Sequence, residues 1–161
     1  MYTIIGLGNP GEEYELTRHN TGKMAVDALE NKEVKAKYIH QDTFMNKSGS
    51  AVAKVIKSKK AASKLIVIYD DLDLPFGVMK ISWNRGSGGH KGLESVIRAV
   101  KTKEFIRIRI GIGKKGDVEK HILGKFTPKE REELKKLFKN LVTAVEVLIE
   151  DGLEPAMTQF N

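Results

Sequence analysis

The chain has 161 residues, 40% of them apolar, and it contains no cysteine. A chain of this length can bury roughly 70% of the surface that its unfolded form exposes, so we expect one domain, residues 1–161, around a single core. The lack of cysteine excludes disulfides, thiolate metal sites and a cysteine nucleophile, and it fits a cytoplasmic protein.

The charge balance is basic, with 28 Lys and Arg against 21 Asp and Glu, a formal charge of +7 and an isoelectric point near 9.5. This excess favours a polyanionic partner. Part of it lies in residues 54–64, where lysines that close a helix and face water explain it equally well. No apolar run reaches the length of a membrane span and no signal peptide is recognisable, so we expect no membrane association.

The first half of the chain alternates apolar runs with helical patterns. Residues 2–7 predict a strand that ends at Gly-Asn-Pro-Gly, and residues 21–30 predict a helix. Residues 36–40 predict a short strand, and Ser48 is expected to cap the next helix. The continuous apolar run 65–69 predicts a strand buried on both faces.

The second half continues the alternation. Residues 77–83 predict a strand, and an amphipathic helix is expected after the glycine-rich stretch 87–92. Residues 105–112 alternate isoleucine with arginine, as in a strand with two different faces. A helix at about 128–150 follows a capping box in which Thr127 is the cap.

Strands that alternate with helices predict one α/β domain, with a twisted, mixed and mostly parallel sheet and helices on both faces. Ligands bind such sheets beyond the carboxyl ends of the strands. We therefore expect the functional site at the loops that carry Asn9, Asp70 and His90.

A glycine pattern after the first predicted strand matches the dinucleotide fingerprint G-x-G-x-x-G, at Gly6, Gly8 and Gly11. That fingerprint needs an apolar helix that starts at its last glycine, whereas here Pro10 and the polar run 12–20 follow. The P-loop pattern and the G-x-S-x-G nucleophile elbow are absent. The sequence thus disfavours nucleotide-driven and serine-nucleophile chemistry.

Of the four histidines, His40 and His121 lie among polar residues and fit a solvated surface. His19 follows the loop that leaves the first strand, and Asp70 ends a buried strand expected nearby. A carboxylate bonded to one ring nitrogen raises the basicity of the other, which is what a general base requires.

The acids of the stretch 70–73, DDLD, have two alternative roles. They could bind a divalent metal, but nothing nearby supplies further ligands at a recognisable spacing. We therefore expect Asp71 and Asp73 to cap turns, and we expect no metal or cofactor.

Arg107 and Arg109 lie on one face of a central strand, where a charge needs a partner. Two roles are possible, an internal ion pair and a phosphate clamp, because a guanidinium can bind either a carboxylate or a phosphate bidentately. The residues alone indicate a hydrolase-like enzyme or a nucleic-acid binder with a His/Asp pair.

Five stretches in order, 6-GLGNPGEEYELTRHNTG-22, 43-TFMNKSG-49, 69-YDDLDLPFG-77, 88-GGHKGL-93 and 107-RIRIGIG-113, closely resemble bacterial-type peptidyl-tRNA hydrolases. The resemblance implies a monomeric, metal-independent enzyme that cleaves the ester between a peptide and the 3′-terminal ribose of tRNA, and so recycles the tRNA.

The resemblance also implies roles for single residues. His19 would be the general base, Asp70 would hold its imidazole, and Asn9 would recognise the peptide backbone. The implied substrate-binding residues are Tyr14, Asn20, Phe44, Met45, Asn46, His90 and Lys91. The implied contacts to tRNA phosphate are Arg109, Lys80 and Arg85.

The chain departs from the family pattern at three places. Lys91 stands where the family usually has asparagine, and Ser82 stands where a lysine accompanies the clamp arginine. The segment between the first helix and TFMN is short, as if two strands near the sheet edge were missing. Lys91 and the short segment motivate one alternative, a non-catalytic RNA-binding relative. The acids of DDLD independently motivate a second, a metal-dependent hydrolase.

Overall fold

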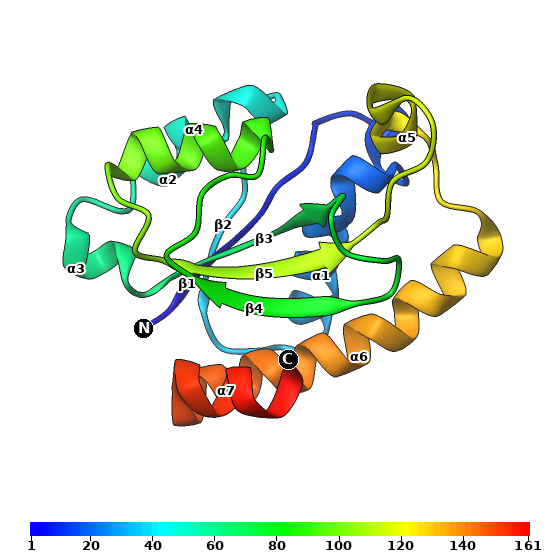
Figure 1. Cartoon of the computed structure of the whole chain (residues 1–161). Helices are drawn as coiled ribbons and strands as arrows, with labels where there is room; N and C mark the ends of the chain where they lie inside the picture. Colours follow the sequence, from blue (N-terminus) through cyan, green and yellow to red (C-terminus); the bar gives the residue numbers. More distant parts are fainter.

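Five strands form one sheet in the order β2-β1-β3-β5-β4 in the computed structural model, which describes residues 1–161 (Figure 1). The strands are β1 (Thr3–Gly6), β2 (Lys37–Ile39), β3 (Leu65–Asp71), β4 (Met79–Trp83) and β5 (Ile106–Gly111). All neighbours pair in parallel except β4 and β5, which are antiparallel. The predicted mixed, mostly parallel sheet is confirmed.

Helices cover both faces of the sheet, as predicted. They are α1 (Thr21–Asn31), α2 (Ser48–Ala53), α3 (Lys59–Ala62), α4 (Lys91–Val100), α5 (Val118–Leu123), α6 (Pro128–Asp151) and α7 (Leu153–Phe160). Three 3-10 turns are η1 (Glu12–Tyr14), η2 (Arg18–Asn20) and η3 (Met45–Lys47). Figure 1 shows α2 and α4 on one side of the sheet and α6 and α7 on the other. No helix is long and apolar enough to cross a membrane.

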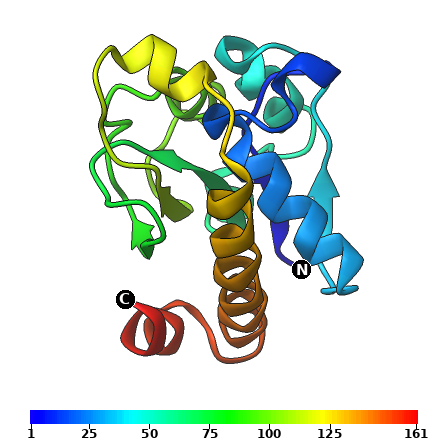
Figure 2. The same cartoon turned by 90° about the vertical axis from the view of Figure 1, so that its right-hand side faces the viewer.

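Strand alternation divides the core into two layers. Ile66, Ile68 and Ile108 point to the layer of α1 and α6, while Val67 and Tyr69 point to the layer of α2 and α4. The long helix α6 runs across its layer, and α7 folds back beside it at the C-terminal end (Figure 2). Loops, rather than the long helices, surround the carboxyl end of β3, where Asp70 lies.

Close backbone contact fixes α1 against the sheet. A Cβ at Gly6 would lie 2.1 Å from the Gly22 carbonyl oxygen, and one at Gly22 would lie 2.2 Å from the Ile68 oxygen. Only glycine allows this approach at both positions. Gly6, the first glycine of the pattern that resembles a nucleotide fingerprint, therefore serves helix packing together with Gly22. This packing brings His19, which precedes α1, to the end of β3.

Element boundaries differ from the predictions at α2. Ser48 is not the cap, because η3 leads directly into the helix and the Ser48 hydroxyl donates to the Met45 carbonyl oxygen at 2.6 Å. The helix ends at Ala53 with Lys54 as its C-terminal cap, so only the first of the lysines in 54–64 closes it, and the others lie beyond. A separate short helix, α3, begins there with Ser58 as its cap. The helix predicted at about 128–150 spans Pro128–Asp151 and has the predicted capping box.

Candidate active site

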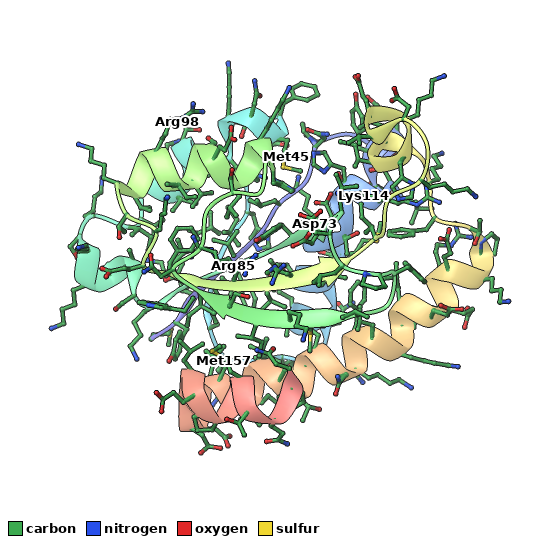
Figure 3. The ribbon with its side chains drawn as sticks, viewed as in Figure 1. Met45, Asp73, Arg85, Arg98, Lys114 and Met157 are labelled. Carbon is green, nitrogen blue, oxygen red and sulfur yellow. The ribbon has the colours of Figure 1, made fainter.

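A cavity of about 850 Å³ lies where the loops after β1 and β3, the stretch before α4, the turn η3 and the helix α5 meet. Asn9, Asp70 and His90 line it, so the three loops expected to form the site do lie together. Figure 3 places Met45, Asp73 and Lys114 on this side of the sheet and Met157 on the other.

Asp70 accepts two hydrogen bonds from imidazole rings. His19 Nδ1 lies 2.7 Å from Asp70 Oδ2, and His90 Nε2 lies 2.9 Å from Asp70 Oδ1. The two rings are tilted against each other with centroids 4.9 Å apart. Asp70 is 3% exposed, so both bonds form in a nearly dry environment where they are strong.

The remaining ring nitrogens differ in what they can do. His90 caps α4, and its Nδ1 accepts from the Leu93 amide at 3.2 Å, which requires the His90 proton to be on Nε2. Both nitrogens of His90 are thus occupied. His19 donates from Nδ1 to Asp70, so its Nε2 carries a free lone pair. Within this network, His19 Nε2 is the one nitrogen available to accept a proton.

The charge of Asp70 depends on these partners. Its burial alone would raise the pKa of the carboxyl, but the charge and hydrogen bonds of His90 and His19 outweigh burial and lower the pKa to about 2. The carboxylate therefore stays ionised throughout the neutral range, and it holds both rings in the tautomers described above.

Acid unfolding should report this depressed pKa. The folded-state pKa of Asp70 lies below the ordinary value of 3.8, so its stabilisation is fully present above about pH 4 and is lost as the pH falls toward 2. We expect Asp70→Asn to remove on the order of 2 kcal/mol of this pH-dependent stability. Urea unfolding of both proteins between pH 2 and 5 measures it, and parallel curves would contradict the prediction.

Asn9 and Asn20 form a paired support. The Asn20 side chain accepts from the Asn9 amide and donates to the Asn9 carbonyl, both at 2.9 Å. Asn9 Oδ1 accepts from the Met45 amide at 2.8 Å, which leaves Asn9 Nδ2 free to donate. Asn20 does not line the main cavity: its amide is used on the Asn9 backbone, so it positions Asn9 rather than facing this space.

The wall beside Asn9 is formed by η3 and the residue before it. Met45 is buried, whereas Asn46 is exposed with its amide unpaired, and Phe44 is 56% exposed. Tyr14 does not line the cavity but packs edge-on against Phe44, with ring centroids 6.3 Å apart. Apolar residues of α5 across the cavity, Val118 among them, complete an apolar rim.

Positive groups gather at another part of the cavity. Arg109 Nε donates to Asp71 Oδ2 at 2.8 Å and its Nη1 donates to Ser82 Oγ at 3.3 Å. Arg85 and Lys91 are exposed and line the cavity as well. Lys80, the β4 residue opposite Arg109, does not line it. Arg109 thus has the internal ion pair, and it still borders the cavity.

Arg107 has a different environment from Arg109. It is fully buried, its guanidinium stacks on the Phe105 ring, and it donates to main-chain carbonyls of Lys103, Phe105 and Arg85. Burial lowers its pKa to about 10. Neither an ion pair nor a phosphate clamp describes Arg107; it anchors the chain that leads from β4 to the glycine-rich stretch.

Replacing Arg107 with lysine should therefore destabilise the protein. One ammonium cannot reach three carbonyl oxygens with the geometry of a guanidinium, so buried acceptors lose their donors. We expect the free energy of unfolding to fall by about 3 kcal/mol, measured by urea denaturation. Arg98→Lys, an exposed change on α4, is the control and should alter stability by less than about 0.5 kcal/mol.

The remaining acids of DDLD and the two histidines outside the site have partners of their own. Asp71 Oδ1 accepts from the Asp73 amide at 2.8 Å, so Asp71 caps a turn as predicted. The Asp73 carboxylate pairs instead with the Lys114 ammonium at 2.8 Å. His40 is exposed as predicted, but the prediction for His121 was wrong. His121 is half-buried because Nε2 bonds the Ile112 carbonyl at 3.0 Å.

A metal could reach one group of ligand atoms. Those of His19, Asp70 and His90 lie within 4.8 Å of one another. His19 Nδ1 and His90 Nε2 already donate hydrogen bonds to Asp70, so a metal ion would have to replace both of these protons. Of the acids of DDLD only Asp70 belongs to this group; Asp71 and Asp73 do not.

Sequence reasoning missed one wall of the cavity. The helix α5 and Lys114 before it contribute to the lining, but the short segment shows no clear helical pattern. A signal was present in Asp117, whose side chain caps α5 by accepting from the Lys120 amide at 3.0 Å.

Comparison with known proteins bears on the whole chain. Residues 3–161 match the family model described as peptidyl-tRNA hydrolase. The chain is 41% identical to the peptidyl-tRNA hydrolase of Thermodesulfovibrio yellowstonii, covering 100% of this chain and 99% of the relative. It is 39% identical to that of Aquifex aeolicus, covering 98% and 95%.

A solved structure shares the fold. The crystal structure of peptidyl-tRNA hydrolase from Acinetobacter baumannii superposes with a TM-score of 0.89 at 31% identity, covering 100% of this chain and 94% of that one. Sequence and fold agree over essentially the full length, and the chain belongs to the peptidyl-tRNA hydrolase family.

Proposed function

We propose that the protein hydrolyses the ester between the peptide and the 3′-terminal ribose of peptidyl-tRNA, with His19 as the general base. The observation that carries this proposal is the free Nε2 of His19, which is held by Asp70 and lines the same cavity as Asn9 and Asn46. A base with one available nitrogen beside neutral amides suits acyl transfer to water.

In this mechanism, His19 Nε2 takes a proton from a water molecule while the oxygen of that water bonds to the ester carbonyl carbon. The negative charge passes to the carbonyl oxygen, where the free amides of Asn9 and Asn46 and the ammonium of Lys91 are the available donors. The tetrahedral intermediate then collapses. The bond to the ribose 3′ oxygen breaks, and that oxygen takes the proton from His19.

The positive part of the cavity suits the tRNA end. Arg85, Lys91 and Arg109 line it, and lysine or arginine contacts to phosphates give affinity that falls as salt is added. We infer that the protein acts as a monomer, because a single chain already brings His19, Asp70, Asn9 and Asn46 to one cavity. We infer that the protein acts in the cytoplasm, where its tRNA substrate is made.

The test is release of tRNA from N-acetyl-aminoacyl-tRNA by the purified protein. We expect cleavage of this substrate and sparing of aminoacyl-tRNA with a free amine, which lacks a peptide bond for Asn9 to recognise. Salt-sensitive RNA binding without cleavage would instead support the RNA-binding alternative. The intact hydrogen bonds of Asp70 with His19 and His90 argue against that alternative, because a protein that only binds RNA does not need them.

A further inference from the structure

The positive charge of the chain is concentrated on one side of the sheet. Residues 45–64, which run from η3 to the start of β3, and residues 91–105, which run from α4 to the start of β5, hold ten Lys and Arg against two Glu. Their net charge is therefore +8, while all the other residues together have 18 Lys and Arg against 19 Asp and Glu, or −1. These two segments thus account for the whole formal charge of +7.

The opposite side of the sheet has no such excess. Helices α6 and α7, within residues 128–160, hold five Lys and Arg against seven Asp and Glu, a net charge of −2. Helices α2 and α4 lie across the sheet from them (Figure 1). The molecule therefore has an electrostatic field that turns the side of α2 and α4 toward an approaching polyanion.

Six cations on this positive side are exposed and form no salt bridge, and we call them the basic face. They are Lys54, Lys57, Lys60, Arg98, Lys101 and Lys103. The two acids on this side already have partners, since Glu104 pairs with the Lys59 ammonium at 3.2 Å and Glu94 accepts from the Ser87 hydroxyl at 3.1 Å. The basic face thus lacks an anionic partner within the protein.

Packing holds together the elements that carry the basic face. The Gly49 amide of α2 donates to Ser95 Oγ of α4 at 2.8 Å, and a Cβ at Gly49 would lie 2.2 Å from the Ser95 carbonyl oxygen, so the two helices are in close contact. The salt bridge between Lys59 and Glu104 joins α3 to the segment that follows α4. The cations of α3 and those at the end of α4 therefore belong to one surface.

This surface reaches the active-site cavity along α4. Lys91 lines the cavity and is the first residue of the helix. Lys91, Glu94, Arg98 and Lys101 are exposed and follow one another at intervals of three or four residues, so they lie along one side of α4. Figure 3 shows Arg98 on the outer side of this helix. At about 1.5 Å per residue, the row extends about 15 Å from the cavity.

We propose that the basic face binds the phosphate backbone of the double-helical part of the tRNA, while the cavity binds its 3′ end. A cavity of about 850 Å³ holds only the end of such a molecule, and RNA that leaves it past Lys91 lies over the cations of α4. Contacts from lysine and arginine to phosphates fix position without reading bases, so the face accepts tRNAs of any sequence. This inference rests on the proposed hydrolysis of peptidyl-tRNA.

The test compares N-acetyl-aminoacyl-tRNA with the N-acetyl-aminoacyl ester of a trinucleotide that has the sequence of the tRNA 3′ end. The trinucleotide has no stem to contact the basic face, so its kcat/KM is the reference within each protein, and a general loss of activity cancels. The variant Lys57→Gln, Lys60→Gln, Arg98→Gln, Lys101→Gln should lower the tRNA-to-trinucleotide ratio of kcat/KM about tenfold, because each exposed ionic contact contributes modestly.

The matched control, Lys129→Gln, Lys135→Gln, Lys136→Gln, Lys139→Gln, removes the same charge from exposed positions of α6. It should preserve the ratio within about twofold. In the basic-face variant alone, the dependence of log kcat/KM for the tRNA on log salt should become shallower by about one per lost phosphate contact. An equal fall of the ratio in both variants, or a fall in neither, overturns the inference and leaves the proposed function standing.

Binding of uncharged tRNA, measured by filter retention, tests the basic face without hydrolysis. The basic-face variant should bind about tenfold more weakly than the wild type and the control. If the wild type cleaves neither substrate, the proposed function fails, and this measurement still decides the inference, because equal affinities of the two variants overturn it. Weaker binding to vesicles of anionic phospholipid with unchanged affinity for tRNA would assign the face to a membrane surface and would also overturn the inference.

Discussion

Replacing His19 with alanine should lower kcat for N-acetyl-aminoacyl-tRNA by about a thousandfold. General-base catalysis contributes roughly 10²–10⁴ to such reactions, and no other nitrogen of the network can replace His19 Nε2. His90 cannot take over, because its two nitrogens are bonded to Asp70 and to the Leu93 amide. The measurement is initial-rate release of tRNA under saturating substrate.

The matched control is His121→Gln, which changes a histidine that does not line the cavity. It should retain activity within about twofold, and circular dichroism should show that His19→Ala remains folded. Equal rates for His19→Ala and the wild type would exclude His19 as the base. A loss in both variants would point to a general effect on folding.

Replacing Asp70 with asparagine should reduce kcat by about 10²–10⁴ with little change in KM. The amide keeps the shape of the carboxylate, but its nitrogen donates, so it cannot accept from both His19 Nδ1 and His90 Nε2. At least one ring must change tautomer or turn away, and a wrong tautomer of the base has an effect of this size in triad enzymes.

Asp151→Asn makes the same chemical change at an exposed position at the end of α6 and should leave kcat and KM unchanged. The split between kcat and KM distinguishes positioning from binding. If Asp70→Asn raised KM and left kcat intact, Asp70 would contribute to substrate binding rather than to holding the base.

Local patterns were sufficient for much of the fold. The alternation in β5, the buried run of β3 and the capping box of α6 depend on neighbours in sequence, and the structure has each of them. The start of α2 was misassigned, because η3 brings Ser48 inside the helix. The short helix α5 was missed for a related reason, since six residues carry little periodicity.

The site was predictable in part. The carboxyl ends of parallel strands meet at one edge of a sheet, and this rule alone predicts that Asn9 and Asp70 lie together. The contact between His19 and Asp70 followed from the same reasoning, and the structure has it at 2.7 Å. The second imidazole on Asp70 was not foreseen, because His90 reaches it only through the packing of α4.

The α/β class, the family and the polar residues of the site can all be read from the amino-acid sequence, since they follow from residue type and order along the chain. Folding decides which nitrogen of His19 is free, and it decides that Arg107 anchors a loop while Arg109 borders the cavity. The reason is physical: proton positions, desolvation and the sign of a local field depend on groups distant in sequence that only folding brings together.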